Sequence, residues 1–497
     1  MSQRIGAVFY WSAGIILLLV IVGFFVPDSL EMITAQTQAF ISSVFGWYYL
    51  IIVSLFVLVC LFFIVSPYGK LKLGKDEDKP EFNMPTWFAL LFSAGMGTGL
   101  LFWGAAEPIS HYAIDSPTAE PGSEEAFLES MRFTFFHWGL HAWGIYAIVA
   151  LCLGYFKFRK DASGTISSAL SPLMDADGVI GKTVNVIGVV ATVTGIATTL
   201  GFGAVQINGG ITFLTGIGES FLFQFVIIVV VTVLYLISAF TGIQKGIRYL
   251  SNVNMILAGI LLLFVIIVGP TLDAMNIFTN TLGQYIQTLP EMSLRITPTD
   301  PDARDWINDW TIFYWAWWMA WSPYVGTFVA RVSKGRTLRQ FMIGVLFVPS
   351  LIGFIWFSFL GGSAILFESE QGANLASLEI EEMLFGLLSQ FPLAIATSIL
   401  ALVLIAIFFI TSGDSATFVL GMQTTNGATN PARRIKFIWG ILLSAIATIL
   451  LYSGGLQAVE NTMIVAAFPF SIVMLLMVYA LIKAVRQERK EQKNRAK

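Results

Sequence analysis

Tryptophan and tyrosine side chains gather in two segments of the sequence. In the segment 310–324, five tryptophans lie within the first twelve residues. With about 100° between successive residues of an α-helix, three of these tryptophans share one face. They are Trp317, Trp318 and Trp321. A helix also places the rings of the other segment on one broad face, and these are Trp138, Trp143 and Tyr146.

Aromatic faces of this kind bind cations that cannot donate hydrogen bonds. A quaternary ammonium group is attracted to the negative face of a ring, at roughly 0.5–2 kcal/mol per ring, so three or four rings make a useful site. The alternative is a belt of aromatic residues at the membrane interface, to which Trp310 and Trp315 could belong. Trp143 and Tyr146 lie twelve or more residues into an apolar segment that begins near residue 131, which favours a box of rings over a belt.

Glycine alternates with other residues in the segment 93–99, at Gly95, Gly97 and Gly99. Each glycine costs a helix about 1 kcal/mol relative to alanine. Close packing of two helices needs small residues only at every fourth position, so a spacing of two favours an unwound stretch. Transporters bind substrates and ions at helices that are broken in the middle of the membrane.

Hydroxyl side chains occur at two further places in apolar segments. Thr411 and Ser412 are adjacent, and their oxygens could bind a hard cation such as sodium or bond back to their own helix. We interpret them as a polar interruption of the segment 408–415. Asp414 follows them, and it is the only acid within a predicted span apart from Glu107 at the outer edge of another. An intramembrane acid suggests a functional site, with helix capping as the alternative for Asp414.

The elements that must position these residues are predicted to be membrane-spanning helices. The composition is 56% hydrophobic and only 12% charged, against about a quarter charged in soluble domains. A bilayer core takes roughly 20 helical residues to cross. Continuous apolar runs exclude a barrel, whose strands alternate in polarity. The class is therefore all-α and polytopic, with twelve predicted spans at 7–26, 47–66, 86–108, 131–156, 183–206, 221–241, 247–269, 310–332, 341–367, 391–420, 435–453 and 462–484.

Charge placement supports this count. With both termini in the cytoplasm, 25 of the 28 basic residues lie on cytoplasmic segments, as the positive-inside rule requires. The net charge of −3 averages two faces of opposite sign and gives no indication of a nucleic-acid partner. Cys60 and Cys152 fall inside spans, which argues against a disulfide framework. The basic tail after residue 483 is an orientation signal, or a contact for anionic lipid.

Two other classes of protein fit the sequence less well. An enzyme with a metal site is suggested by His137 and His141, four residues apart, but the glutamate of the H-E-x-x-H motif is missing. The segment 178–183 lacks the first glycine of a phosphate-binding loop. We therefore expect no enzyme. A passive channel remains the third class, since a broken helix could line a pore.

Four motifs together resemble the betaine/choline/carnitine transporter family, and the resemblance covers essentially the whole chain. It implies a leucine-transporter-like fold, with two inverted five-helix repeats after two leading helices, and a homotrimer. The implied divisions are 1–80, 81–272, an extracytoplasmic amphipathic connector at 273–309, 310–484 and a basic tail at 485–497. The motifs are Gly95–Gly104, His137–Trp143, Trp310–Pro323 and Phe408–Ser415.

The resemblance also implies roles for individual residues. The substrate cage would comprise Trp138, Trp143, Tyr146 and Trp318, with Trp317, Trp321, Gly97 and Gly99 close by, and Tyr324 would lie near a gate. One sodium site would comprise Ala94, Met96, Phe408, Thr411 and Ser412. Thr194 and Thr198, which are four residues apart, are candidates for a second sodium site.

The family members most similar to this chain are sodium-coupled importers of glycine betaine, used for osmoprotection in the cell membrane. Proton-coupled choline carriers tend to have aspartate where Gly99 stands, so sodium coupling fits best, with no other cofactor. Thr98 departs from the commoner isoleucine, and the short tail after the last span weakens the expectation of osmotic sensing by a long cytoplasmic helix. Carnitine, choline and ectoine remain alternative substrates.

Overall fold

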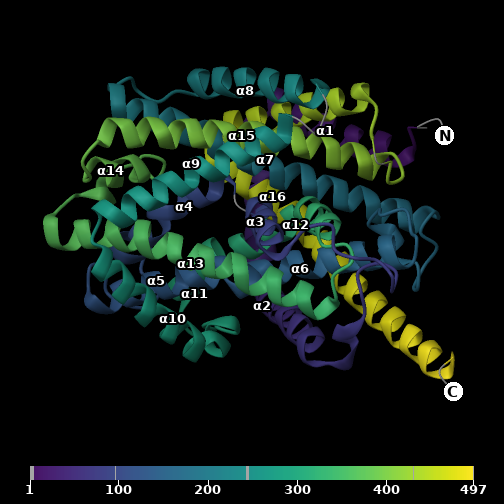
Figure 1. Ribbon diagram of the computed structural model, residues 1–497. Helices are drawn as coiled ribbons and strands as arrows, with labels where there is room; N and C mark the ends of the chain where they lie inside the picture. Colours follow the sequence, from purple (N-terminus) through teal and green to yellow (C-terminus); the bar gives the residue numbers. More distant parts are fainter. Residues whose placement is uncertain (1–4, 96, 242–245, 429, 496–497) are drawn as a thin grey trace.

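The computed structural model describes residues 5–95, 97–241, 246–428 and 430–495, and every regular element in these ranges is a helix (Figure 1). The all-α prediction is therefore confirmed. The first half comprises α1 (Ala7–Phe25), α2 (Pro27–Val65), α3 (Met84–Gly95), α4 (Thr98–Ile109), α5 (Glu124–Trp138), α6 (Leu140–Gly154), α7 (Val179–Thr215), α8 (Phe221–Thr241) and α9 (Gly246–Val268). The second half comprises α10 (Thr271–Ser293), α11 (Pro301–Trp306), α12 (Phe313–Val332), α13 (Leu338–Gln371), α14 (Met383–Ser389), α15 (Ala394–Thr424) and α16 (Arg433–Arg495).

Within the described ranges, nine helices are long and apolar enough to cross a bilayer, or ten if the bent pair α3–α4 counts as one span. The difference from twelve has two causes. The last two predicted spans lie in α16, on either side of a kink at Gly454 and Gly455. Gly455 has φ of 64°, a left-handed conformation that glycine adopts readily. In addition, α12 is not among the nine helices, because its many tryptophans make it less apolar. The count of twelve stays a prediction.

The predicted break in the glycine-rich segment is confirmed. α3 ends at Gly95 and α4 begins at Thr98, and the two helices meet at an angle of 70°. Gly97 lies between them with an extended backbone, and Met96 is outside the described residues. An unwound backbone at this depth is tolerated in a membrane only where protein or a cavity surrounds it.

A second break, at Gly139, divides the predicted fourth span into α5 and α6. A Cβ atom on Gly139 would lie 2.5 Å from the carbonyl oxygen of Phe135 and 2.8 Å from the hydroxyl of Tyr285, so only glycine fits. That hydroxyl, from α10, accepts a hydrogen bond from the Leu140 amide at 3.1 Å. Trp138 therefore ends one helix, and the two later rings belong to the next.

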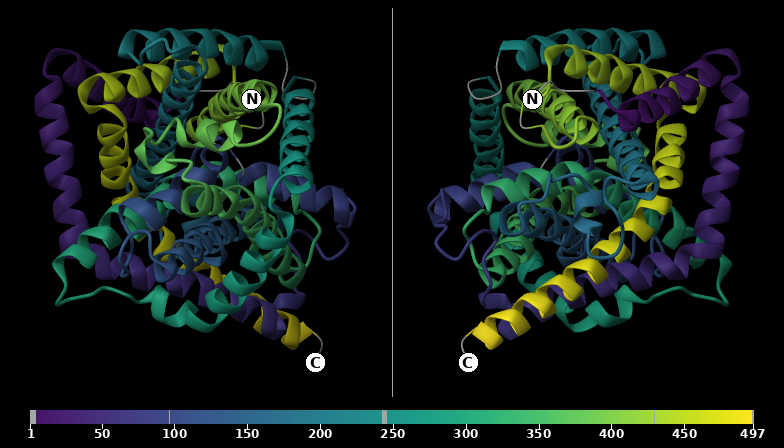
Figure 2. Two further views of the ribbon diagram at one scale, coloured as in Figure 1. Left: turned by 90° about the vertical axis from the view of Figure 1, so that its left-hand side faces the viewer. Right: turned by 90° about the vertical axis from the view of Figure 1, so that its right-hand side faces the viewer.

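The helices divide into an interior group and an outer group. The most apolar window of Glu124–Arg159 is 94% buried and that of α7 is 83% buried, against 22% for α1. α12 packs along α6, while α1 and α2 follow one edge of the bundle (purple in Figure 2). Outer side chains such as Leu222 and Ile267 are apolar and exposed. A surface of this kind cannot face water, so we place the outer helices against lipid and look for the site inside.

Candidate functional site

Five of the predicted rings converge between α5, α6 and α12. The ring centroids of Trp138 and Trp318 are 5.0 Å apart, those of Tyr146 and Trp318 are 5.9 Å apart, and those of Trp143 and Tyr146 are 5.5 Å apart. None of these side chains is more than 5% exposed, so they face the interior and do not form an interfacial belt. We call Trp138, Trp143, Tyr146, Trp317 and Trp318 the aromatic cage.

The rings of the aromatic cage are closely packed against one another. Trp317 and Trp318 stack at 4.8 Å with an angle of 12° between their planes. A cation attracted to a ring occupies the space above its face, within about 6 Å of the centroid. Trp317 and Trp318 already cover each other's faces, so a methylated ammonium group does not fit between them. Such a group would have to contact the other faces of the rings, or enter after the rings rotate apart.

Trp315, which could have belonged to a belt, is also buried. It is 1% exposed and stacks on His141, with 5.3 Å between the ring centroids. His141 in turn bonds to Ser293 at 3.0 Å, whereas His137 bonds to Glu107 and Thr311. The two histidines considered as a metal pair thus have separate partners.

The two predicted glycines lie where the broken span touches the tryptophans of α12. A Cβ atom on Gly99 would lie 2.5 Å from Trp317, and one on Gly97 would lie 3.2 Å from Trp321. Trp321 is turned toward α7, because its indole nitrogen donates a hydrogen bond to the Gly195 carbonyl at 2.8 Å. The ring centroids of Trp321 and Tyr324 are 5.6 Å apart, and Trp321 lies beside the cage.

A cavity of about 70 Å³ brings together three of the predicted sodium ligands and the predicted gate residue. We call it the hydroxyl cavity, because serine and threonine oxygens line much of it. Ala94 lies in the last turn of α3, close in sequence to one lining residue, and Met96 is outside the described residues. The lining residues are Ser93, Ser251, Asn254, Met255, Trp321, Tyr324, Phe328, Phe408, Thr411, Ser412 and Ser415.

The threonines predicted to bind sodium also bond to their own helices. Thr411 donates to the carbonyls of Ile407 at 2.9 Å and Phe408 at 3.1 Å, and α15 runs through this segment without interruption. The interruption is thus one of polarity and not of helical structure, and the back-bond that was the alternative to a sodium ligand is present. Thr194 donates to Ala191, and Thr198 donates to Thr194. A hydroxyl that donates its proton keeps lone pairs that can bind a cation.

Asp414 links two helices. Its carboxylate accepts a hydrogen bond from the Ser238 hydroxyl of α8. Lys436 of α16 lies nearby and donates to the Ala239 carbonyl of α8 at 2.5 Å. The contact with α8 goes beyond the capping role that was the alternative for this acid, and Asp414 is not among the residues that line the hydroxyl cavity.

Glu107 and Tyr314, for which no role is predicted from the sequence, both contact the aromatic cage. The Glu107 carboxylate accepts hydrogen bonds from the Trp138 indole at 2.7 Å and from the Tyr314 hydroxyl at 2.5 Å. The Tyr314 ring lies 5.8 Å from the Trp318 ring. Two sequence signals could have indicated them: an acid in an otherwise apolar motif, and an aromatic residue four positions before Trp318.

Phenylalanines extend the aromatic surface toward a larger cavity of about 460 Å³. Phe202 of α7 and Phe313 of α12 line this cavity and contact Trp317, at 5.2 Å and 5.7 Å between ring centroids. Asp115, Asp309 and Glu460 line it as well. The cage therefore adjoins a partly acidic cavity.

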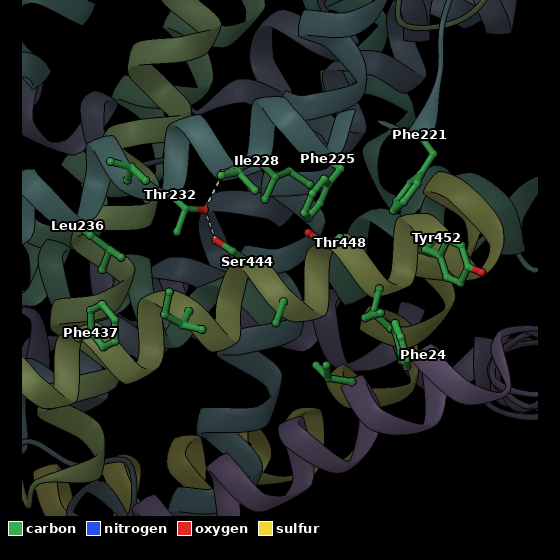
Figure 3. A pocket seen from close by; sticks show the side chains of 16 residues that line it. Phe24, Phe221, Phe225, Ile228, Thr232, Leu236, Phe437, Ser444, Thr448 and Tyr452 are labelled. Carbon is green, nitrogen blue, oxygen red and sulfur yellow. Dashed lines mark hydrogen bonds between the residues drawn. The ribbon is translucent and has the colours of Figure 1, made fainter. Parts of the chain in front are cut away.

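A groove of about 780 Å³ between α1, α8 and α16 has a different chemistry (Figure 3). Its lining is aliphatic and aromatic except for a few hydroxyls, of which Thr232 bonds to Ser444 at 2.5 Å. No lining residue is charged. The groove therefore suits hydrocarbon better than a zwitterion or an ion.

Comparisons with known proteins show which family this chain is similar to. A family model described as "BCCT, betaine/carnitine/choline family transporter" matches residues 7–490. The glycine betaine transporter OpuD of Bacillus subtilis (strain 168) is 58% identical, covering 100% of this chain and 98% of that protein. The ectoine/hydroxyectoine transporter of Virgibacillus pantothenticus is 41% identical, covering 97% of each chain.

Proposed function

Because the chain belongs to the betaine/carnitine/choline transporter family, we propose that it imports glycine betaine, or a closely related osmolyte, by sodium symport. It is a multi-pass membrane protein. The proposed setting is the cell membrane, and the proposed role is osmoprotection. The sodium ions are co-transported ligands in this scheme.

The observation that carries the proposal is the burial of the aromatic cage inside the bundle. Five rings from three helices meet at centroid distances of 4.8–6.3 Å, within a region that lipid does not reach. Buried rings attract a cation by 2 kcal/mol or more each, roughly, because little water competes for it. A trimethylammonium group needs no hydrogen-bond partner, which is the property that a purely aromatic lining serves.

The hydroxyl cavity supports sodium as the coupling ion. Thr411, Ser412 and the Phe408 carbonyl supply oxygen ligands beside the broken span, and Thr194 with Thr198 is the proposed second site. Two sodium ions entering with one net-neutral zwitterion gain about 2.3 kcal/mol each at 100 mV, and about 1.4 kcal/mol each from a tenfold gradient. The sum of about 7 kcal/mol allows about 10⁵-fold accumulation.

The helices can be grouped into the twelve proposed spans. The pairs α3–α4 and α5–α6 each count as one, α12 is included, and α16 counts as two because of its kink. α10 and α11 lie in the proposed connector. We further propose two five-helix repeats, cytoplasmic termini and a homotrimer.

The proposal is tested by uptake of radiolabelled glycine betaine into proteoliposomes, with either sodium or potassium outside. We expect saturable uptake that requires sodium. Equal rates in the two salts would exclude sodium symport, and uptake that does not saturate would indicate a channel.

Ectoine is the second candidate substrate, because a relative that is 41% identical carries that name. Competition for labelled glycine betaine by unlabelled ectoine, carnitine and choline in the same vesicles ranks the substrates. Stronger competition by ectoine than by glycine betaine itself would reverse the assignment.

A further inference from the structure

The Glu107 carboxylate lies behind the aromatic cage, at the end of α4, and is fully buried. A buried carboxylate is retained only where hydrogen bonds or charges compensate for the loss of water. Three side chains from α5 and α12 contact it, and the buried His111 ring lies 3.4 Å from one of its oxygens. The Trp138 indole and the His137 ring lie 2.7 Å away, and the Tyr314 hydroxyl lies 2.5 Å away.

The chemistry of the indole fixes the direction of one hydrogen bond to Glu107. An indole nitrogen can only donate, so the Glu107 oxygen that faces Trp138 is an acceptor. His137 also contacts the Thr311 hydroxyl at 3.0 Å through its other nitrogen. The roles of the two His137 nitrogens follow its tautomer, and a neutral ring that donates to Glu107 and accepts from Thr311 gives both nitrogens a partner. The donors match an anionic carboxylate, which accepts hydrogen bonds and donates none.

A metal site is the competing explanation, because Glu107, His111 and His137 offer ligand atoms within 4.8 Å of one another. Two ligands of one tetrahedral zinc ion, each about 2.0–2.1 Å from it, lie about 3.3 Å apart. Glu107 and His137 are only 2.7 Å apart, which is a hydrogen-bond length, and both nitrogens of His137 have partners. The geometry favours a hydrogen-bonded hub.

We propose that Glu107 is a positioning residue of the aromatic cage, which fixes the Trp138 and Tyr314 rings and makes the cage prefer a cationic headgroup to a neutral one of the same shape. An indole or phenol that donates to an anion becomes more electron-rich, so the face of its ring attracts a cation more strongly. Charge also acts over several ångströms where water is excluded. This inference rests on the proposed function of the cage.

The test compares two ligands of the same shape, glycine betaine and 3,3-dimethylbutanoate, in which carbon replaces the quaternary nitrogen. Binding to the detergent-purified full chain is measured by titration calorimetry for the wild type and for Glu107→Gln. We expect Glu107→Gln to weaken betaine binding about tenfold, equivalent to about 1.4 kcal/mol, and to change binding of the analogue, whose headgroup is uncharged, less than about twofold. The preference of the wild type for betaine would then be largely lost.

Two variants in the same hub serve as controls. Thr311→Val removes the partner on the far side of His137 without touching the carboxylate, and we expect it to keep the wild-type preference. Tyr314→Phe removes one donor to Glu107 and keeps the ring, and we expect it to lower the preference about threefold. This second variant also tests the inference if Glu107→Gln does not fold.

The possible results are distinct. A wild type that binds both ligands equally contradicts the proposed function of the cage. A wild type that prefers betaine, together with Glu107→Gln or Tyr314→Phe variants that prefer it equally, overturns the role of Glu107. Loss of preference in Thr311→Val to the same extent would show a general effect of disturbing the hub and would also overturn it.

Discussion

The aromatic cage and the hydroxyl cavity differ in where their side chains find partners. Four of the five cage rings contact rings from another helix, as Trp318 contacts Trp138 and Tyr146, whereas Trp143 contacts Tyr146 of its own helix. The Thr411 hydroxyl has carbonyl acceptors within its own helix. Threonine can always bond back in this way, whereas an indole ring has no such local alternative.

This difference explains what a sequence pattern can indicate. Thr397 donates to carbonyls three and four residues earlier in α15, as Thr411 does, but does not line the hydroxyl cavity. The two threonines look alike in sequence and locally alike in structure. A face of several tryptophans deep in a span indicates a tertiary contact, while a threonine in a span indicates little by itself.

The sharpest test of the comparison removes one ring. We expect Trp318→Ala to raise the KM for betaine uptake about 100-fold, since it removes one ring of the cage and leaves space into which the other rings can move. Trp315→Ala is the matched control, because Trp315 is buried in the same helix but stacks on His141. We expect the control to lower the Tm and to change the KM less than about threefold. Equal KM changes in the two variants would mean that the cage has no special role.

A smaller effect is expected where the broken span touches the cage. Gly99→Ala places a methyl group 2.5 Å from Trp317, whereas Gly97→Ala places one 3.2 Å from Trp321. Overpacking of this kind costs about 1–3 kcal/mol, so we expect Gly99→Ala to raise the KM about tenfold and Gly97→Ala to have a smaller effect. The reverse order would show that Trp321, and not Trp317, limits the space for substrate.

The hydroxyl cavity is tested by sodium dependence at saturating betaine. We expect Thr411→Ala to raise the sodium concentration for half-maximal uptake about tenfold, since one of a few oxygen ligands is lost. Thr397→Ala removes an equivalent back-bond outside the cavity, so it should leave sodium dependence unchanged. If both variants behave like the wild type, Thr411 serves only its own helix, and the difference between the two regions is sharper still.

The sequence predicted the long helices and the break at Gly95–Gly99, because apolar length and glycine spacing are local signals. The break at Gly139 could not be predicted, since its support is Tyr285 and the hydrogen bond spans 145 residues. Glu107 was visible as an acid at the edge of a span. Its partners lie 31 and 207 residues away in sequence, so its link to the cage appears only in the fold.

The smallest expected effect is on stability, and it concerns two connectors whose carboxylates lie close together although they are far apart in sequence. Glu219, between α7 and α8, and Glu381, between α13 and α14, both lie against Gly209, where an added Cβ would be 3.0 Å and 2.7 Å from them. Partial burial and the neighbouring Glu381, Glu382 and Glu379 raise the pKa of Glu219 to about 8. Burial likewise raises the pKa of Glu381.

A raised pKa means that the folded protein holds this proton more tightly than the unfolded chain does. The stability of the folded state is therefore greatest at acidic pH and falls as the pH rises from about 4.5 toward about 8. Glu219→Gln removes that fall, so its Tm should match the wild type at pH 5 and exceed it by at most about 2 °C at pH 9. The exposed acid Glu370 at the end of α13 supplies the control, Glu370→Gln, which should follow the wild-type profile. A Glu219→Gln profile parallel to the wild type would show that water screens the two carboxylates from each other. Contact between two elements would then matter in the dry interior of the bundle but not in its connectors.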